Sequence, residues 1–256
     1  MRALKFRLSA EFGCFRDLSE GFKELTTTKQ IPSNIQLGGL LGAITGLEGY
    51  GMVALNKLDK NIPIKLPDFY TTLKNMHYSI VSEKPKFNVS KQVISNTNGS
   101  AVKNIKAPIV TANMGYQVLE KPSYIVYIYF DEAHSEIYNT LKYKLENTEV
   151  EYQTYFGFTH FFSNFDYLGE HDLNVVNADE LVIDSWFEDS KANYDINYLD
   201  FSPNKKAYYM RERYATEFNP SMLKKTNITV INTSSYVEYS EETYLDDSII
   251  LAKLSF

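Results

Sequence analysis

The sequence predicts an α+β fold, in which a β-α-β-β-α-β domain with one inserted hairpin is followed by a smaller lobe of short strands. Segments with the strand period of two are interleaved with only two segments of helical period. The chain contains 20 Tyr and 16 Phe, a composition that favours strands and stacked rings. With 256 residues, of which 44% are hydrophobic, it can bury a core in one large domain or in two smaller units.

The first half of the domain contains one clear strand and one clear helix. Apolar residues alternate with polar ones over residues 4–12, as expected of a half-buried strand. Over residues 33–47 the apolar residues recur at helical spacing, and Ser33 or Asn34 is suited to be the N-cap. We therefore expect a helix that ends near Gly49.

The second half repeats this order. MHYSIV at 76–81 predicts a strand, and YIVYIYF at 124–130 predicts another that is apolar on both faces and therefore central in its sheet. The polar run at 88–114, rich in Asn, Ser, Thr and Gly, predicts a long hairpin or finger between them. HSEIYNTLKYKLEN at 134–147 predicts an amphipathic helix, and QTYFGFTHFF at 153–162 predicts the last strand.

This order of elements is the ferredoxin-like arrangement, the topology of the RNA-recognition motif. We place the ferredoxin-like domain at residues 1–165, with an inserted β-hairpin thumb at about 84–121. Beyond residue 166 the sequence predicts short strands and no clear helix, as in NITVINTSSYVEYS and SIILAKLSF. We therefore expect a small β-rich C-terminal lobe at residues 166–256.

Two stretches are similar to parts of nucleotide-driven enzymes. In LGGLLGAITGL the glycines 38, 42 and 46 are spaced by four on one helical face, and no glycine is followed by the lysine of a P-loop. We interpret them as a strip for close packing against a sheet or a partner. Asp131-Glu132-Ala133-His134 follows an apolar strand, as in DEAH-box ATPases. Without a P-loop we interpret these acids as the start of the second helix, where the helix dipole favours negative charge.

Signals of catalysis, metal binding and membrane insertion are sparse. Cys14 is alone, so neither an intrachain disulfide nor a cysteine cluster can form, and four histidines are scattered without metal-ligand spacing. No Gly-x-Ser-x-Gly motif occurs. No apolar run reaches the roughly 18 residues of a membrane span. We expect a cytoplasmic protein without metal, cofactor, enzymatic activity or membrane contact.

The charge is unevenly distributed along the chain. The net charge is -6, but residues 1–125 contain 16 Lys+Arg and 9 Asp+Glu, a net +7, whereas residues 126–256 contain 10 and 23, a net -13. The window 84–121 contains six lysines and the single acid Glu120. The positive charge of this window would attract an anionic partner such as a phosphate backbone, whereas the negative charge of the second half of the chain would repel it. The alternative is a solvated loop that happens to carry lysines.

Several stretches together resemble one known family. ALKFRLSAEFGCFRD, TTTKQIPSN and LGGLLGAITGL are similar to the N-terminal signature of CRISPR-associated protein family five, a RAMP-type subunit of type I Cascade complexes. QVLEKPSYIVYIYF is similar to the strand that closes the family's thumb hairpin, and TYFGFTHFF to its strand with an aromatic-glycine-Ser/Thr pattern. The resemblance covers most of residues 1–165, and the general texture is similar to the type I-B branch.

The resemblance implies a non-catalytic subunit that holds the 5′ handle of CRISPR RNA (crRNA) and caps the backbone filament of an antiviral surveillance complex. It implies as partners the crRNA 5′ handle, the Cascade backbone subunit and the Cascade large subunit. Through the large subunit it implies indirect contact with target DNA near the PAM. The family's thumb folds over the RNA, and in this chain the thumb coincides with the lysine-rich window.

From this resemblance we select candidate RNA contacts. Lysines of the thumb would neutralise phosphates, and its asparagines would hydrogen-bond bases or sugars. In the segment between the first strand and the first helix, two cations form a second group, and one phenylalanine is a possible stacking platform. Solvent exposure, or packing for the phenylalanine, is the alternative for each. The candidates are Lys91, Lys103, Lys106, Asn96, Asn98, Asn104, Arg16, Lys29 and Phe15.

Two other functions remain open. One branch of the family, in type I-C systems, is a metal-independent endoribonuclease that processes precursor crRNA with a Tyr, Lys and His cluster acting by acid-base chemistry. No matching positions for that cluster can be assigned in this chain, where the histidine nearest to the thumb is His77. The other alternative is a protein-binding adaptor without RNA contact. The acidic second half favours protein over nucleic acid as its partner.

Overall fold

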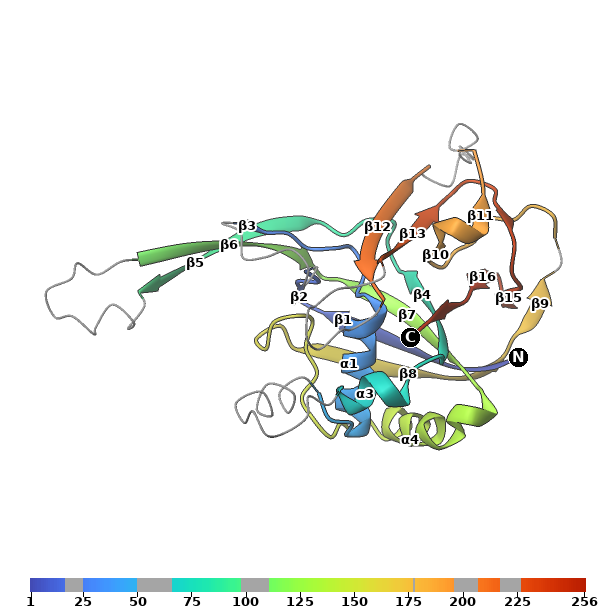
Figure 1. The fold of residues 1–256 in the computed structure, drawn as a ribbon, viewed down its shortest axis with the longest axis horizontal. Helices are drawn as coiled ribbons and strands as arrows, with labels where there is room; N and C mark the ends of the chain where they lie inside the picture. The colour runs from blue at the N-terminus through green and yellow to red at the C-terminus, as the bar shows by residue number, and fades with distance from the viewer. Residues whose placement is uncertain (17–24, 50–65, 98–110, 177, 196–206, 217–226) are drawn as a thin grey trace, which may run out of the picture.

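The computed structural model describes most of the chain: residues 1–16, 25–49, 66–97, 111–176, 178–195, 207–216 and 227–256. It has a mixed α+β architecture dominated by antiparallel sheets (Figure 1). No helix among these residues has the length and apolar character needed to cross a bilayer.

The centre of the molecule is a five-stranded antiparallel sheet in the order β17-β4-β7-β1-β8. Its strands are β1 (Arg2–Ala10), β4 (His77–Ser82), β7 (Ser123–Tyr129), β8 (Ser163–Asp172) and β17 (Leu254–Ser255). The prediction that YIVYIYF forms a central strand is confirmed, because β7 lies between β4 and β1.

The prediction of a strand at residues 153–162 is wrong, because the strand lies about ten residues further along the chain, at Ser163–Asp172. That stretch forms a tight loop, in which Phe156 N–H donates to Phe161 O at 2.8 Å and Tyr155 makes only an isolated bridge with Phe162. Gly157 at its tip has a φ of +86°, which ends any extended run. The fourth strand of the ferredoxin-like order is therefore β8. The predicted domain boundary at 165/166 falls inside it, and β17 returns from the C-terminus to the same sheet.

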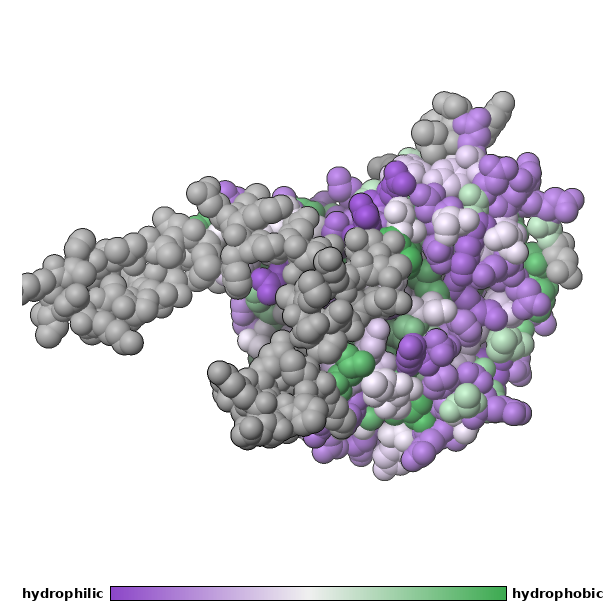
Figure 2. Space-filling model, in the orientation of Figure 1, coloured by the Kyte–Doolittle hydropathy of each residue, from purple (hydrophilic) through white to green (hydrophobic). Residues whose placement is uncertain are grey.

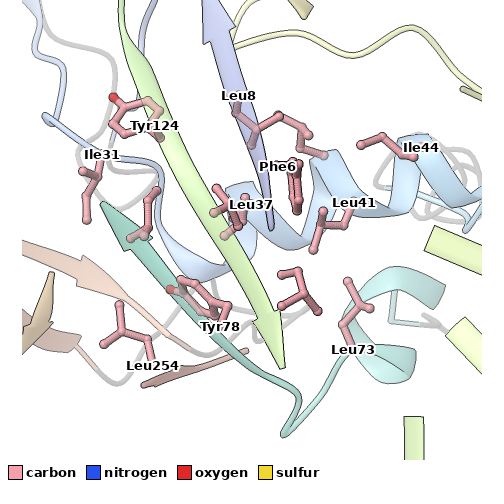
Figure 3. Packing of buried hydrophobic residues seen from close by; sticks show 14 of the residues in the cluster. Phe6, Leu8, Ile31, Leu37, Leu41, Ile44, Leu73, Tyr78, Tyr124 and Leu254 are labelled. Carbon is pink, nitrogen blue, oxygen red and sulfur yellow. The ribbon is translucent and has the colours of Figure 1, made fainter. Parts of the chain in front are cut away.

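In the described part of the chain, three helices lie on one face of this sheet: α1 (Asn34–Thr45), the short α3 (Asp68–Thr72) and α4 (Ser135–Glu146). Ser33 is the N-cap of α1 and forms a capping box with Gln36, in which each side chain accepts from the other residue's backbone N–H. Leu37 and Leu41 of α1 pack against Phe6 and Leu8 of β1 in the main core (Figure 3).

The glycines of α1 are packing residues, but the neighbour they approach is α3. A methyl group on Gly42 would stand 2.6 Å from Cβ of Phe69, and one on Gly38 would stand 3.4 Å from its ring. Gly46 has a different role, because it caps α1 in the left-handed conformation with a φ of +86°.

The acids after β7 also have a structural role. Asp131 accepts a hydrogen bond from Ala133 N–H at the start of the 3-10 turn η2 (Glu132–His134), which leads into α4. The side chain of His134 lies 2.9 Å from the same carboxylate and lowers the pKa of Asp131. The interpretation of these acids as a helix start, one short turn before α4, agrees with this geometry.

The thumb is an antiparallel hairpin of β5 (Val89–Thr97) and β6 (Thr111–Glu120), which extends away from the body in Figure 1. On the other side of β6 lie β2 (Phe12–Gly13), antiparallel to it, and β3 (Leu25–Thr26), parallel to it. The inserted hairpin predicted at about 84–121 is thus present.

The C-terminal part consists of short strands, and it covers the second face of the central sheet, a placement that the sequence did not predict. One sheet has the order β10-β13-β12, a second β16-β15-β9 and a third β11-β14. The sequence pattern missed a 3-10 turn, η3 (Asp189–Lys191). The strand bounds are β9 (Asn174–Val176), β10 (Phe187–Glu188), β11 (Ala192–Asn193), β12 (Tyr209–Ala215), β13 (Asn227–Thr233), β14 (Glu238–Tyr239), β15 (Thr243–Asp246) and β16 (Ile249–Ala252).

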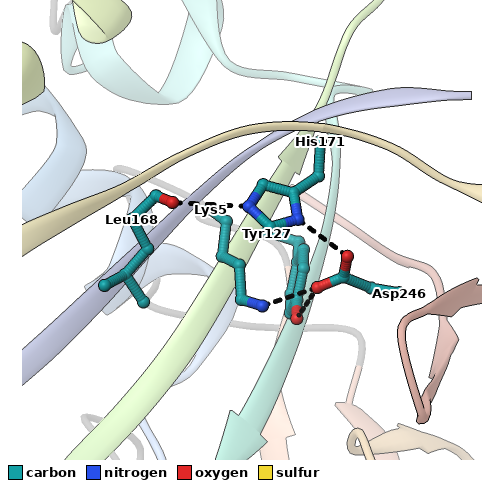
Figure 4. Close-up of polar contacts among 5 residues, drawn as sticks. All are labelled: Lys5, Tyr127, Leu168, His171 and Asp246. Carbon is teal, nitrogen blue, oxygen red and sulfur yellow. Dashed lines mark hydrogen bonds and ion pairs between the residues drawn. The ribbon is translucent and has the colours of Figure 1, made fainter.

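A buried carboxylate joins this second layer to the central sheet (Figure 4). Oδ2 of Asp246 accepts from Lys5 Nζ at 2.6 Å and from Tyr127 O–H at 2.7 Å, and His171 Nδ1 lies 2.7 Å from Oδ1. Burial alone raises the pKa of Asp246, but the three hydrogen bonds outweigh it and the net pKa is lowered. Asp246 is therefore ionised at neutral pH and binds three strands of the other layer.

We predict opposite effects for alanine at two glycines of α1 that lie three residues apart. Gly42→Ala should lower the free energy of unfolding by about 1–3 kcal/mol, because its methyl group collides with Phe69 and overpacks the contact. Gly39→Ala should raise it by up to about 1 kcal/mol, since the nearest atom to its methyl group is 3.7 Å away and alanine favours the helix. Thermal unfolding measures both changes. An increase in Tm for both variants would contradict the close approach of α3.

We predict that Asp246→Asn lowers the free energy of unfolding at pH 7 by about 3–5 kcal/mol, because it leaves Lys5 buried without its counter-charge. The lowered pKa of Asp246 means that its contribution is complete above the ordinary carboxyl pKa and is lost as the pH falls below about 4. Urea titrations between pH 7 and pH 3 should show a shallower loss of stability for the variant than for the wild type. Asp166→Asn, at an exposed ion pair, is the control and should cost less than about 1 kcal/mol.

Candidate nucleic-acid interface

Four exposed lysines surround the base of the thumb: Lys84, Lys86, Lys91 and Lys121. In the described part of the chain, no carboxylate lies within 4.0 Å of any of their ammonium groups. The nearby acid Glu83 pairs instead with Arg7 at 3.1 Å. An unpaired cluster of this kind attracts phosphates.

The two faces of the thumb have different surroundings. Tyr116 and Val118 of β6 lie on the face covered by the loop after α4, where the Tyr116 ring meets Phe158 edge to face at 4.9 Å and Val118 packs with Phe161. Val89, Lys91 and Val93 of β5 lie on the opposite face and are exposed. Next to the body the second face is anchored as well, because Leu119 is buried in the main core and Gln117 Oε1 accepts from Thr28 N–H. Lys91 and Val93 are the exposed residues further along this face.

The loop that covers the thumb is held by a backbone contact. Cys14 N–H donates to Phe156 O at 3.0 Å, and a methyl group on Gly157 would stand 1.9 Å from Cys14 O, which leaves room for glycine alone. Cys14 itself is 2% exposed, and burial raises the pKa of its thiol to about 11. This cysteine is therefore a packed residue rather than a nucleophile.

The structure describes two of the six predicted RNA contacts in the thumb, Lys91 and Asn96. Lys91 is exposed on β5. Asn96 lies in β5 in register with Ala112 of β6. The remaining four candidates, Asn98, Lys103, Asn104 and Lys106, lie outside the described residues.

The second predicted group is not exposed in the way the sequence suggested. Phe15 is 2% exposed and packs against Phe156 at 5.1 Å between ring centroids, so packing is its role and its face is closed to a base. Lys29 Nζ lies 3.6 Å from Oε2 of Glu212, a largely buried carboxylate whose other oxygen accepts from Gln30 N–H. Burial raises the pKa of Glu212, and the charge of Lys29 partly offsets that rise. Arg16 is half-buried beside α1, where its carbonyl accepts from Gln36.

Sequence reasoning missed the exposed aromatic residues of the segment after α4. Tyr152 and Tyr155 are 54% and 43% exposed, and together with the ring of Phe158 they line a cavity beside α1. The pattern TYFGFTHFF predicts a strand, in which half of the rings would be buried. The glycine inside that pattern was the available signal for a loop.

No metal centre is formed by the described residues, since no three His, Cys, Asp or Glu side chains come together there. His134 and His171 contact Asp131 and Asp246, respectively, and His77 contacts Ser255 Oγ at 3.0 Å.

The acidic C-terminal part presents mostly hydrophilic side chains in the upper right of Figure 2.

No family model matches this chain, and no curated protein matches it. Among solved structures, a chain of a "CRISPR RNA-guided surveillance complex" has a TM-score of 0.50 and 12% identity, with 91% of this chain and 90% of that chain covered. A "Crystal Structure of CRISPR-associated Protein" has a TM-score of 0.45 and 8% identity, with 94% of each chain covered. The "Cryo-EM structure of the Type III-B Cmr-beta bound to cognate target RNA" has a TM-score of 0.46 and 11% identity, with 91% of this chain and 86% of that chain covered. At 12% identity the first similarity shows a shared fold, and the predicted fold class is confirmed.

We predict that Lys29→Ala destabilises the fold, whereas Lys91→Ala does not. Removing Lys29 leaves Glu212 buried without its cation, which should lower the free energy of unfolding by about 1–3 kcal/mol. Lys91 is exposed, so its replacement should lower the free energy of unfolding by less than about 0.5 kcal/mol. Because the pKa of Glu212 is already raised, the folded state binds the proton better than the unfolded state, and stability falls as the pH rises above about 4. Lys29→Ala should steepen that fall. Denaturant midpoints at pH 5 and pH 8 test this, and equal effects of both variants would contradict a role of Lys29 in the fold.

Proposed function

We propose that this chain is a non-catalytic, RNA-binding subunit of a CRISPR surveillance complex. In this proposal it belongs to a type I Cascade, of the I-B branch, holds the 5′ handle of crRNA and caps one end of the backbone filament. The observation that carries the proposal is the thumb, a hairpin anchored to the body at its base. Four exposed lysines surround that base, and they have no carboxylate partner in the described part of the chain. The fold shared with a surveillance-complex chain supports it.

The arrangement of charge suits a single strand that crosses the base of the thumb. Lys84, Lys86 and Lys121 lie where the hairpin joins the body, and Lys91 lies further along β5. Phosphate contacts of this kind position a strand without selecting its sequence. In the proposal Lys103, Lys106 and the thumb asparagines 96, 98 and 104 extend the contact along the hairpin, and Arg16 continues it beside α1.

The C-terminal part is assigned to protein partners. Residues 166–256 contain 8 Lys+Arg and 17 Asp+Glu, a net charge of -9, which repels a phosphate backbone. We assign to this side the contacts with the backbone subunit and with the large subunit that reads target DNA near the PAM.

The non-catalytic assignment rests on the histidines. Metal-independent cleavage needs a base near the 2′-oxygen and a donor at the leaving group. His134 and His171 are held by carboxylates away from the thumb, and His160 is stacked on Phe158 at 5.5 Å. His77 lines a pocket with Lys191 and Lys253 to which no thumb residue contributes, so in the proposal it lies away from the RNA. The adaptor alternative leaves the unpaired lysines without a role.

We predict that the triple substitution of Lys91, Lys103 and Lys106 by Ala weakens RNA binding and flattens its salt dependence. Each lost phosphate contact should reduce the slope of log K against log salt by about 0.7. The measurement is a gel shift with a labelled repeat RNA that carries its 5′ handle, in EDTA, with the chain alone and together with its backbone subunit. Lys74→Ala, at an exposed lysine near α3 and away from the thumb, is the control and should leave the slope unchanged.

The same gel distinguishes the alternatives. Intact RNA that shifts with the wild type and less with the triple variant supports the proposal. Shortened RNA in EDTA would replace it with the endoribonuclease. An unshifted RNA in both preparations, or identical salt slopes for all proteins, would leave the adaptor.

A further inference from the structure

Part of the second face of the central sheet is open at the end beside the thumb. The C-terminal strands β15 and β16 cover this face around Tyr127 and Tyr129. Side chains alternate along each strand, so the same face continues through Ser9 of β1 and Ser123 of β7. The register places Asn164 of β8 next to Ser9, and these three residues form one row across the sheet. Asn164 is exposed and both serines are partly exposed, so the row is open to a ligand.

The row presents polar groups that can form further hydrogen bonds. In the described part of the chain, the side chains of Ser9 and Asn164 have no hydrogen-bond partner. Ser123 Oγ donates to the carboxylate of Glu83 and can still accept a hydrogen bond. One amide and two hydroxyls thus offer donors and acceptors side by side, as the edge of a nucleobase requires.

An exposed ring stands at the end of this row. Phe162 is 60% exposed, the largest exposed fraction among the large hydrophobic side chains of the described residues. Its backbone is held, because it bridges to Tyr155 and the next residue, Ser163, donates to Thr154 O at 3.1 Å. Phe162 and Asn164 are two residues apart in an extended segment, so they lie on the same face about 7 Å apart. A fixed, exposed ring beside polar groups is the arrangement on which bases stack.

A strained lysine lies at the same end of the sheet. Lys121 has a φ of +48°, a conformation that favours glycine or asparagine over residues with a long side chain. Its N–H donates to Glu11 O at 2.9 Å, a bond that any residue except proline could make. Its exposed ammonium group has no carboxylate within 4.0 Å in the described part of the chain. The turn therefore does not explain why a lysine stands here.

The sheet brings this lysine close to the exposed ring. Ala10 N–H donates to Pro122 O at 3.1 Å, and Ala10 is paired with Ser163 on its other side. Lys121 and Phe162 each precede one of these partners, so they lie about two strand spacings, roughly 10 Å, apart. One nucleotide can bridge this gap with its base on the ring and its phosphate at the extended lysine side chain.

The neighbouring charges favour an anionic ligand at this end of the face. The two acids beside the row, Glu83 and Asp166, lie 3.1 Å and 3.6 Å from Arg7, which partly neutralises both. Lys84 follows Glu83 at the base of the thumb and is exposed and without a carboxylate partner in the described residues. The row is therefore continuous with the lysines to which we assign RNA.

We propose that this row binds one nucleotide of the RNA, with its base stacked on Phe162 and hydrogen-bonded to Asn164 and Ser9, and with its phosphate at Lys121. The inference rests on the proposed function and deepens it, because it adds a base contact on the body to the phosphate contacts of the thumb. A protein interface would place apolar side chains at its centre. Here the centre is polar and the ring stands at its end, which favours RNA.

The first test is an abasic scan of the 5′ handle with the full chain, alone and together with its backbone subunit. For the wild type, removal of one base should weaken binding about 5- to 150-fold, the effect of one stacked base, while its neighbours matter less. Phe162→Leu should lose a similar factor with intact RNA and become insensitive to the abasic site at that position. Tyr143→Leu is the matched control, because Tyr143 is 56% exposed on α4, on the other face of the sheet.

The second test separates the charge of Lys121 from its role in the turn. Asparagine tolerates the left-handed conformation, so Lys121→Asn should leave the Tm unchanged or raise it. The same variant should weaken RNA binding and reduce the slope of log K against log salt by about 0.7, the effect of one lost phosphate contact. A slope equal to that of the wild type would overturn the assignment of Lys121.

The outcomes separate this inference from the proposed function. A flat abasic scan, or an equal abasic penalty for Phe162→Leu and the wild type, would overturn the inference and leave the proposed function intact. Unchanged RNA binding by Phe162→Leu with weakened assembly of the complex would overturn it as well and assign the face to a protein. Absence of RNA binding by the wild type, alone and with its backbone subunit, would overturn both proposals together.

Discussion

The burial of β7 on both faces is the constraint on which the rest of this structure depends. Tyr124, Val126 and Ile128 point into the core beneath the helices, and Ile125, Tyr127 and Tyr129 point into a second core on the other side. A strand that is apolar on both faces must be covered twice. The helices cover one face, and the C-terminal strands β15 and β16 cover the other.

This double cover also explains where polar groups are buried. The hydroxyl of Tyr127 lies in the second core and donates a hydrogen bond to the carboxylate of Asp246. The same carboxylate accepts a hydrogen bond from Lys5. On the helical side the hydroxyl of Tyr124 donates to Gln30 O at 2.5 Å, and the Gln30 side chain bonds the backbone of Phe87 in turn. Each buried polar atom of β7 thus fixes a segment from elsewhere in the chain. The Gln30 contacts join the two segments that lead into α1 and into the thumb.

One end of the molecule consequently combines a well-packed body with the exposed lysines at the base of the thumb. The thumb packs against the loop around Gly157 through the side chains of Tyr116 and Val118. The backbone of that loop bonds Cys14, and the side chain of Gln36 at the start of α1 bonds the carbonyl of Arg16. The opposite, acidic layer is tied to the sheet by an ion pair and by core packing. This separation of a basic end from an acidic layer is consistent with one surface for nucleic acid and another for protein.

The sequence by itself determined the strands β1 and β7, the helix α1 with its Ser33 cap, the thumb hairpin and the β-rich C-terminus, because period, capping and turn residues act over a few neighbours. It also located the lysines of the thumb. Only the tertiary structure decided that Phe15 is buried, that Lys29 is held by Glu212 and that the fourth strand begins at Ser163, since each depends on contacts distant in the chain. The cavity between α1 and the aromatic loop at residues 152–158 likewise depends on contacts between distant parts of the chain. Its two walls lie more than 100 residues apart in the sequence, and no local pattern brings them together.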